Sequence, residues 1–202
     1  AIRDTPRKAR PYYNLAKSKA RQYRGLPEGK KARAGRIAEH SNSLLRRSLK
    51  ISPDFHLSHG ALARGLAFLG SEEASVGEFR EAIRCHMEAL RTGEAPTLHA
   101  GQIAAHVDAL ARTLLALGRQ DEAVSAYRQG IEWHVMALKE AASTDGQRFH
   151  AEQAAGLYQR MGRWLESAGL RSVARQILQE GLKRFPNCPP LRKDLERLEG
   201  PA

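Results

Sequence analysis

Residues 110–131, LARTLLALGRQDEAVSAYRQGI, hold the pattern that decides the fold. The stretch predicts the end of one helix, a stop at Gly118, and the start of a second helix, since glycine commonly ends a helix in the left-handed conformation. In the second segment the small and apolar residues follow the i, i+4, i+7, i+8 spacing of one helix face: Ala123, Tyr127, Gly130 and Ile131. The stretch therefore predicts two consecutive amphipathic helices joined by a short turn.

The leading triplet of this stretch, Leu110-Ala111-Arg112, recurs along the chain. Its other copies begin at Leu15, at Leu62 and, loosely, at Met161, so that the intervals are 47, 48 and 51 residues. In three copies a glycine stands seven residues after the small residue: Gly70, Gly118 and Gly169. Self-similarity of this kind predicts a solenoid, because one helix pair cannot bury its apolar face without its neighbours.

A leading Leu-Ala, a glycine stop, then Glu-Ala-Val, a tyrosine, a glycine and a closing proline resemble the tetratricopeptide repeat. The resemblance covers about residues 9–186. It implies antiparallel helix pairs whose first helices line a concave groove for a partner. The interval exceeds the family's usual period of about 34 residues, and Val135 stands where a closing proline is expected. Both departures imply the longer helices of some members of the family.

We therefore predict an all-α fold, an α-solenoid of about four antiparallel helix pairs with a C-terminal capping helix. The predicted pairs are 9–24 with 31–50, 54–69 with 74–91, 96–117 with 120–142, and 146–168 with 171–185. The predicted organisation is a flexible basic arm over 1–8 and a single repeat domain over 9–199, with repeats at about 9–53, 54–95, 96–145 and 146–186, and a cap at 189–199.

The charge of the chain is concentrated at its N-terminal end. The 202 residues carry a net charge of +11. Residues 1–50 hold 15 Lys and Arg against 3 Asp and Glu, whereas residues 51–202 hold 18 against 19. Such asymmetry bears on partners rather than on fold. Three interpretations stay open: a solvated helix without a ligand, an acidic protein or peptide partner, and a polyanion such as nucleic acid or anionic lipid.

The resemblance also points to partner-binding residues. In the family, the residue after the small position of each first helix points into the groove, which here gives Lys17, Arg64, Arg112 and Arg163. Further groove candidates lie near them: Tyr13, Arg21, Asp108, Gln159, Arg160 and Glu166. Arg24 shares a helix face with Lys17 and Arg21. A row of cations suits an extended acidic segment, because arginine holds a carboxylate with two parallel hydrogen bonds.

The sequence offers no pattern of catalytic or metal-binding residues. It has no phosphate-binding glycine loop, no Gly-x-Ser-x-Gly elbow and no His-Glu-x-x-His. The pairs His56 with His59 and His99 with His106 each lack a third ligand at suitable spacing, so we expect packing or surface histidines. Cys85 and Cys188 are expected to be two thiols of a reducing compartment. We predict no enzyme, no cofactor and no metal.

The favoured function is a protein–protein interaction scaffold or assembly subunit that binds an acidic or extended partner. Two alternatives remain: an appended repeat domain of a larger bacterial membrane or regulatory protein, and a nucleic-acid-associated protein that uses the basic end. The absence of a long apolar run predicts no transmembrane segment. We expect a cytoplasmic location, or a periplasmic or extracellular one if the chain belongs to a membrane protein. The sequence does not indicate an oligomeric state.

Overall fold

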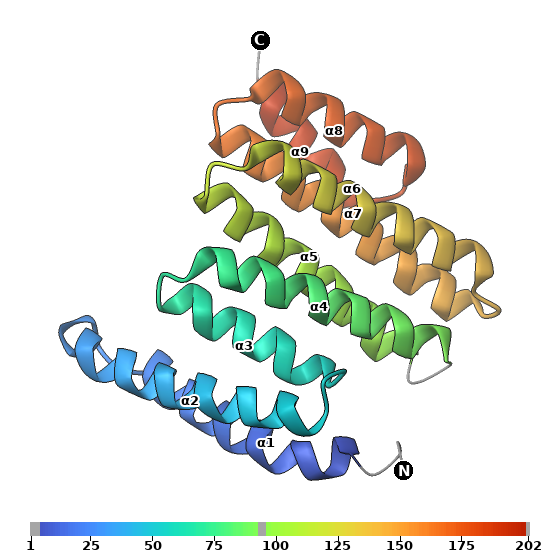
Figure 1. Ribbon diagram of the computed structural model, residues 1–202. Helices are drawn as coiled ribbons and strands as arrows, with labels where there is room; N and C mark the ends of the chain where they lie inside the picture. The colour runs from blue at the N-terminus through green and yellow to red at the C-terminus, as the bar shows by residue number, and fades with distance from the viewer. Residues whose placement is uncertain (1–4, 93–95, 201–202) are drawn as a thin grey trace. The chain divides into compact units, whose positions relative to one another are not determined.

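The computed structural model describes residues 5–92 and 96–200, and these residues form an all-helical fold (Figure 1). Within those ranges the elements are α1 (Thr5–Arg24), the short 3-10 helix η2 (Glu28–Lys30), α2 (Lys31–Ile51), α3 (His56–Phe68), α4 (Glu72–Arg91), α5 (Pro96–Ala116), α6 (Gln120–Glu140), α7 (Thr144–Ser167), α8 (Arg171–Arg184) and α9 (Pro189–Glu199). The predicted all-α fold of helix pairs with a C-terminal capping helix is confirmed. The predicted helix bounds agree with the observed ones to within a few residues.

Two compact units divide the chain. The first unit contains α1 to α4 together with residues 112–119, which comprise the end of α5 and the turn that follows it. The second unit contains the first part of α5, as far as Ala111, together with α6 to α9. Each unit stacks helix hairpins in the manner of an α-solenoid, and each is described by itself below.

In the first unit, α1 pairs with α2, α3 pairs with α4, and α2 packs on α3. One apolar cluster joins the first three helices: Ala16, Leu44, Leu45, Leu62 and Leu66. Buried serine hydroxyls lie at the helix contacts of this unit. Ser48 Oγ donates to the Ala9 carbonyl at 3.1 Å and accepts from Ser58 Oγ at 2.8 Å. These small polar residues let the helices approach closely while their buried hydroxyls stay hydrogen-bonded.

In the second unit, α7 packs between α6 and α8, and α9 contacts both α7 and α8. Its interior consists mainly of large apolar side chains, buried to 4 % exposure or less: Leu157, Tyr158, Met161, Leu165, Ile177 and Leu178. Glycines provide the close approaches here. A Cβ at Gly130 would lie 3.0 Å from Val107, and one at Gly181 would lie 3.0 Å from Tyr158. The capping helix α9 seals this unit by burying Leu191 and Leu198.

The repeat signals seen in the sequence have clear structural roles. The predicted glycine stops Gly70, Gly118 and Gly169 have φ angles of 73°, 73° and 78°, which is the left-handed region that favours glycine. The small residues Ala16, Ala63 and Ala111 are at most 1 % exposed. The lengthened interval is explained by long helices, such as the 21 residues of α6 and the 24 of α7. Helix α6 continues through Val135, where the family's proline would have ended it.

The N-terminal boundary differs from the predicted one. Residues 1–4 of the predicted arm lie outside the described residues, and α1 already begins at Thr5, so residues 5–8 belong to a helix. Pro6 suits the first turn of a helix because its φ angle is fixed in the helical range, whereas Pro11 lies inside α1.

Cys85 and Cys188 are both free. Over residues 5–92 and 96–200, no helix combines the length and apolarity needed to span a bilayer.

Candidate functional site

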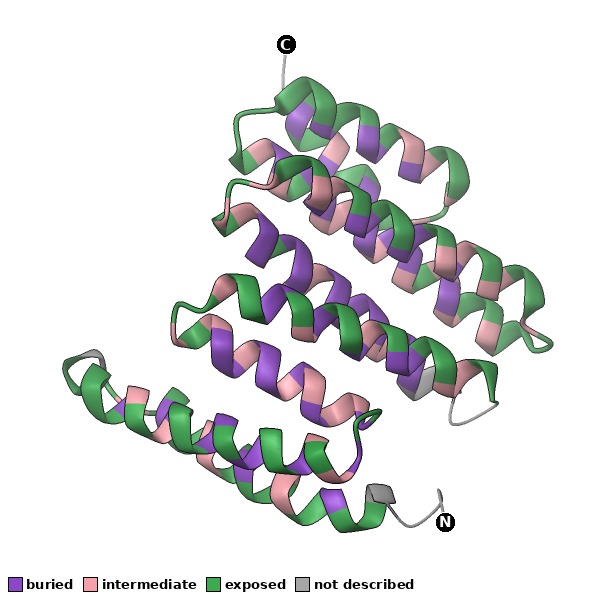
Figure 2. Ribbon diagram, viewed as in Figure 1, coloured by how far each residue is buried: buried purple, intermediate pink, exposed green. Residues whose placement is uncertain are grey.

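Four of the predicted partner-binding residues lie on α1 and α3 of the first unit. Lys17, Arg21 and Arg24 are exposed on α1, and Arg64 is half-buried on α3. Helices α1 and α3 are in contact. We call these four residues the α1–α3 cationic face. Figure 2 shows exposed positions along much of the first helix.

Arg64 is the residue of this face whose pKa is changed by its surroundings. Burial and the nearby Arg24 guanidinium together lower the pKa of Arg64 below its usual value, although Tyr13 and Tyr23 act in the opposite direction. Arg24 also lies over the Tyr23 ring, with its guanidinium carbon 5.9 Å from the ring centroid. Among the described side chains, no carboxylate forms an ion pair with any of the four cations. The face therefore concentrates positive charge that the first unit does not itself neutralise.

Tyr13 lies at a helix interface of the first unit. Its half-buried ring packs against the apolar cluster of the first unit and meets the Phe55 ring edge-on, with centroids 5.7 Å apart. Tyr12 packs against the same cluster. These contacts assign both tyrosines to the helix interface, since edge-to-face ring pairs stabilise packing.

In the second unit, the predicted groove cations are held by carboxylates of the same unit. Arg163 donates to both carboxylate oxygens of Asp194, at 2.7 and 3.2 Å. Arg160 Nε lies 3.4 Å from Asp108 Oδ1. The Asp194 side chain is only 5 % exposed and also accepts a hydrogen bond from Gln159 at 2.9 Å. Arg163 thus ties the capping helix to α7, which the sequence could not indicate because Asp194 lies 31 residues away.

Of the remaining groove candidates, one is exposed and two have partners within the protein. Arg112 is exposed on α5. Glu166 is held by both terminal nitrogens of Arg197 from the capping helix, and this pairing lowers the pKa of Glu166. Asp108 accepts a hydrogen bond from Tyr127 at 2.8 Å. The structure therefore brings Arg24 near Arg64 and leaves Lys17, Arg21 and Arg112 exposed. It places Arg160, Arg163 and Glu166 in internal ion pairs.

Of the histidines singled out in the sequence, His59 makes hydrogen bonds and His56 contacts a neighbouring ring. The ring of His59 lies between two acceptors, Glu78 Oε2 at 2.6 Å from Nδ1 and the Pro53 carbonyl at 2.7 Å from Nε2. Burial opposes its protonation, but these acceptors outweigh that effect, so the pKa of His59 lies above its usual value. Both nitrogens then donate, as in a protonated imidazole. The His56 ring instead lies against His86, with centroids 4.3 Å apart.

Sequence reasoning missed a second histidine pair, in the second unit. His134 Nδ1 on α6 lies 3.3 Å from His150 Nδ1 on α7, and both side chains are buried. Trp133 packs edge-on against both rings. Burial, with the charges of His150 and Arg160, lowers the pKa of His134 to about 3, and burial also lowers the pKa of His150. The available signal was an aromatic residue directly before each histidine, Trp133 and Phe149.

Comparisons with known proteins add little to this geometry. No family model matches the chain, and no curated protein matches it. Among solved structures, it is similar to a chain of the crystal structure of the APC/C hetero-tetramer Cut9-Hcn1, at 11% sequence identity and a TM-score of 0.24. The match covers 95% of this chain and 46% of that one, so this chain spans about half the length of the other. A score this low supports no conclusion about fold or function.

Proposed function

We propose that this chain is a non-enzymatic interaction scaffold that binds an acidic segment of a partner protein on the α1–α3 cationic face. The observation that carries the proposal is the proximity of Arg24 and Arg64. Two like charges lie close together, one of them partly removed from water, with no carboxylate of the described side chains to balance them. Such an arrangement raises the free energy of the unbound face, and an incoming carboxylate would lower it.

The chemistry of these cations supports an extended acidic ligand. Lys17, Arg21 and Arg24 follow one another along one face of α1 at helical spacing, so they present charge along a line rather than at a point. Arginine binds carboxylates in a planar, two-bond geometry, which favours Asp and Glu side chains. A segment with several acidic residues would therefore contact the face at several places.

We also propose that the helix pairs are repeats of the tetratricopeptide type, with the four repeats and the single domain bounded as predicted above. Buried small residues and left-handed glycine stops recur at the expected positions in both units. A repeat scaffold of this kind works by presenting a surface rather than a reactive centre. This part of the proposal explains why the cations lie on first helices, α1 and α3.

The test uses a short fluorescein-labelled peptide rich in Asp and Glu, with fluorescence anisotropy as the readout. We expect the double variant Arg24→Gln/Arg64→Gln to bind at least about tenfold more weakly, since each hydrogen bond to a charged group is worth about 1.5–3 kcal/mol and about 1.4 kcal/mol corresponds to a factor of ten. The matched control is Arg175→Gln/Lys183→Gln, which removes two exposed cations of α8 in the second unit. Circular dichroism checks that each variant remains helical.

Two outcomes would contradict the proposal. Equal losses in the variant and the control would show that only net charge matters. Tighter binding of a single-stranded oligonucleotide than of the acidic peptide, with the steep salt dependence of counterion release, would favour a nucleic-acid partner instead.

A further inference from the structure

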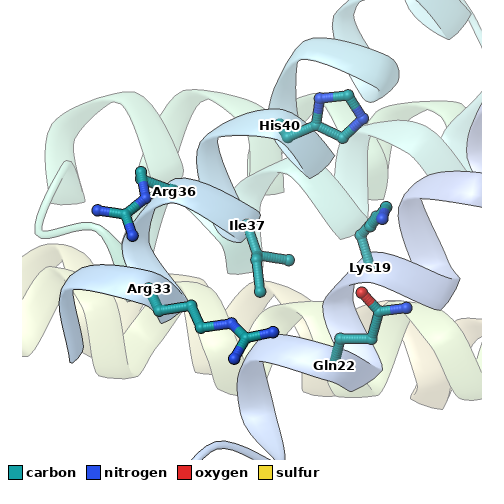
Figure 3. A pocket seen from close by; sticks show the side chains of 6 residues that line it. All are labelled: Lys19, Gln22, Arg33, Arg36, Ile37 and His40. Atoms are coloured by element: carbon teal, nitrogen blue, oxygen red, sulfur yellow. The ribbon is translucent and has the colours of Figure 1, made fainter. Parts of the chain in front are cut away.

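A second basic site lies between α1 and α2, apart from the α1–α3 cationic face. It is a pocket of about 490 Å³ lined by Lys19, Gln22, Arg33, Arg36, Ile37 and His40. Figure 3 shows Lys19 and Gln22 on one helix and the other four residues on the next, with the Arg36 guanidinium turned outward at the rim. We call this site the end pocket.

The residues that line the end pocket come from α1 and α2, and none of them from α3. Asn42 of α2 meets Gly65 of α3, and Ser48 of α2 accepts a hydrogen bond from Ser58 of α3. Arg33 precedes Asn42 by nine residues, which at 3.6 residues per turn places it on the opposite side of α2. The end pocket and the α1–α3 cationic face are therefore separate surfaces of the same helix pair.

The cations of the end pocket have no anionic partner in the part of the chain that the structure describes. Arg33 and Arg36 are exposed and Lys19 is half-buried, and no described carboxylate forms an ion pair with any of them. None of the six lining residues is acidic. Three positive charges thus line one small volume without internal neutralisation.

We infer that the end pocket binds a phosphorylated side chain of a protein partner. A phosphomonoester carries a charge of about −1.5 to −2 near neutral pH and three acceptor oxygens. It therefore suits a pocket with the Arg33 guanidinium, the Lys19 ammonium and the Gln22 amide, and with Arg36 at the rim, better than a single carboxylate does. Ile37 provides an apolar contact for the carbon chain that bears the phosphate.

The lining argues against a nucleic acid in this pocket. Single-stranded nucleic acids are bound by stacking bases on aromatic side chains, and no Phe, Tyr or Trp lines the pocket. Clusters of arginine are a recurrent means of recognising phosphorylated peptides. The inference rests on the proposed function in one respect, since it takes the phosphate to belong to a protein.

The experiment compares two labelled peptides with uncharged flanks, one with a central phosphoserine and one with serine. We expect the intact chain to bind the phosphoserine peptide at least about tenfold more tightly, and the double variant Lys19→Gln/Arg33→Gln to lose that preference. The amide chemical shifts that respond should lie in the second half of α1 and the first half of α2. The control Arg46→Gln/Arg47→Gln removes two exposed cations elsewhere on α2 and should retain the preference.

Several results would overturn the inference. Equal affinity for the two peptides would do so, as would equal losses in the pocket variant and the control. Inhibition of phosphopeptide binding by a single-stranded oligonucleotide at lower concentration than by inorganic phosphate would assign the pocket to nucleic acid.

The outcome is distinguishable from that of the proposed function. The variant Arg24→Gln/Arg64→Gln should leave phosphopeptide binding unchanged while it weakens the acidic peptide. Loss of phosphopeptide binding in this variant would contradict the assignment to the end pocket, whereas intact binding of the acidic peptide would contradict only the α1–α3 cationic face.

Discussion

The interiors of the two units differ in the side chains that fill them. In the first unit, serines and the buried Asn42 lie at the helix contacts, and neither amide atom of Asn42 has a hydrogen-bond partner among the described residues. In the second unit, the corresponding contacts are made by Tyr158, Leu178 and other large apolar residues. A buried polar group without a hydrogen-bond partner destabilises the fold, whereas burial of apolar area stabilises it.

The surface charges of the two units differ in a related way. Several arginines of the second unit pair with carboxylates, such as Arg184 with Glu132 and Arg163 with Asp194. In the first unit, Arg84 pairs with Asp54 in the same way. The cations of α1 and α2 on the α1–α3 cationic face and in the end pocket have no such partner among the described side chains. The comparison teaches that ion pairing is not uniform: both units contain paired arginines, but the α1–α3 cationic face and the end pocket have no carboxylate partner among the described side chains.

The largest expected difference between the two units concerns pH, because pH changes their stabilities in opposite directions. His134 titrates near 6.5 when unfolded but has a pKa of about 3 in the fold. The unfolded chain therefore binds more protons between these values, and stability of the second unit falls as the pH drops through that window. At pH 5 the loss is about 2 kcal/mol. His59 of the first unit has a raised pKa, so its contribution is present below 6.5 and is lost as the pH rises through its folded pKa.

The two tryptophans make this prediction measurable. Trp133 and Trp164 are the only ones in the chain, and both belong to the second unit. Urea unfolding followed by tryptophan fluorescence should shift to lower urea between pH 7 and pH 5, and His134→Leu should reduce that shift. A urea midpoint that does not change with pH would contradict the prediction that the buried histidine pair destabilises the second unit at low pH.

An intermediate effect is expected at the glycines that allow close helix contacts. In the first unit, a Cβ at Gly65 would lie 2.0 Å from Asn42 Oδ1. Gly65→Ala should therefore destabilise the unit by about 1 to 2 kcal/mol. In an Asn42→Ala background most of that cost should disappear, because the side chain that obstructs the new methyl group is gone.

The matched pair in the second unit should behave differently. A Cβ at Gly162 would lie 2.8 Å from Leu178, but Leu178→Ala itself costs about 2 to 5 kcal/mol. Truncating the obstructing residue should therefore not restore wild-type stability there. Thermal unfolding followed by circular dichroism measures both cycles, and additive costs for Gly65→Ala and Asn42→Ala would contradict the proposed contact.

The smallest expected effect compares one arginine from each unit. Arg163→Gln should destabilise the second unit by about 1 kcal/mol, because it leaves the buried Asp194 carboxylate with fewer donors. Arg24→Gln should change stability by no more than about 0.5 kcal/mol, and in the stabilising direction at low salt, since it removes a like charge near Arg64. Urea unfolding at low and high salt measures the stability change of each variant. Equal losses of stability in the two variants would contradict the expected difference between these two arginines.

Much of the fold was predictable because its signals are local. Helix periodicity and the glycines at 70, 118 and 169 lie within a few residues of the features they produce, so helix bounds and turns follow from them. The N-terminal end of α1 was less predictable, because Pro6 and Pro11 are both compatible with either a helix start or an extended arm.

The candidate site was predictable only in part. The charge excess of residues 1–50 directed attention to the N-terminal helices, whereas the row of groove cations was drawn from the repeat pattern alone. That pattern could not reveal that Asp194 reaches Arg163 from the capping helix, or that Tyr13 turns towards Phe55. It also gave no reason to group Lys19 with Arg33, which lie on different helices.

The sequence by itself determined that this chain is helical, that its helices come in pairs, and that its positive charge gathers at one end. These properties depend on neighbours along the chain and on composition, both of which can be read without coordinates. Only the tertiary structure decided which cations keep their charge unbalanced and which are neutralised, because ion pairing depends on distances between residues far apart in sequence. For the same reason, only the packing of α1 against α2 created the end pocket.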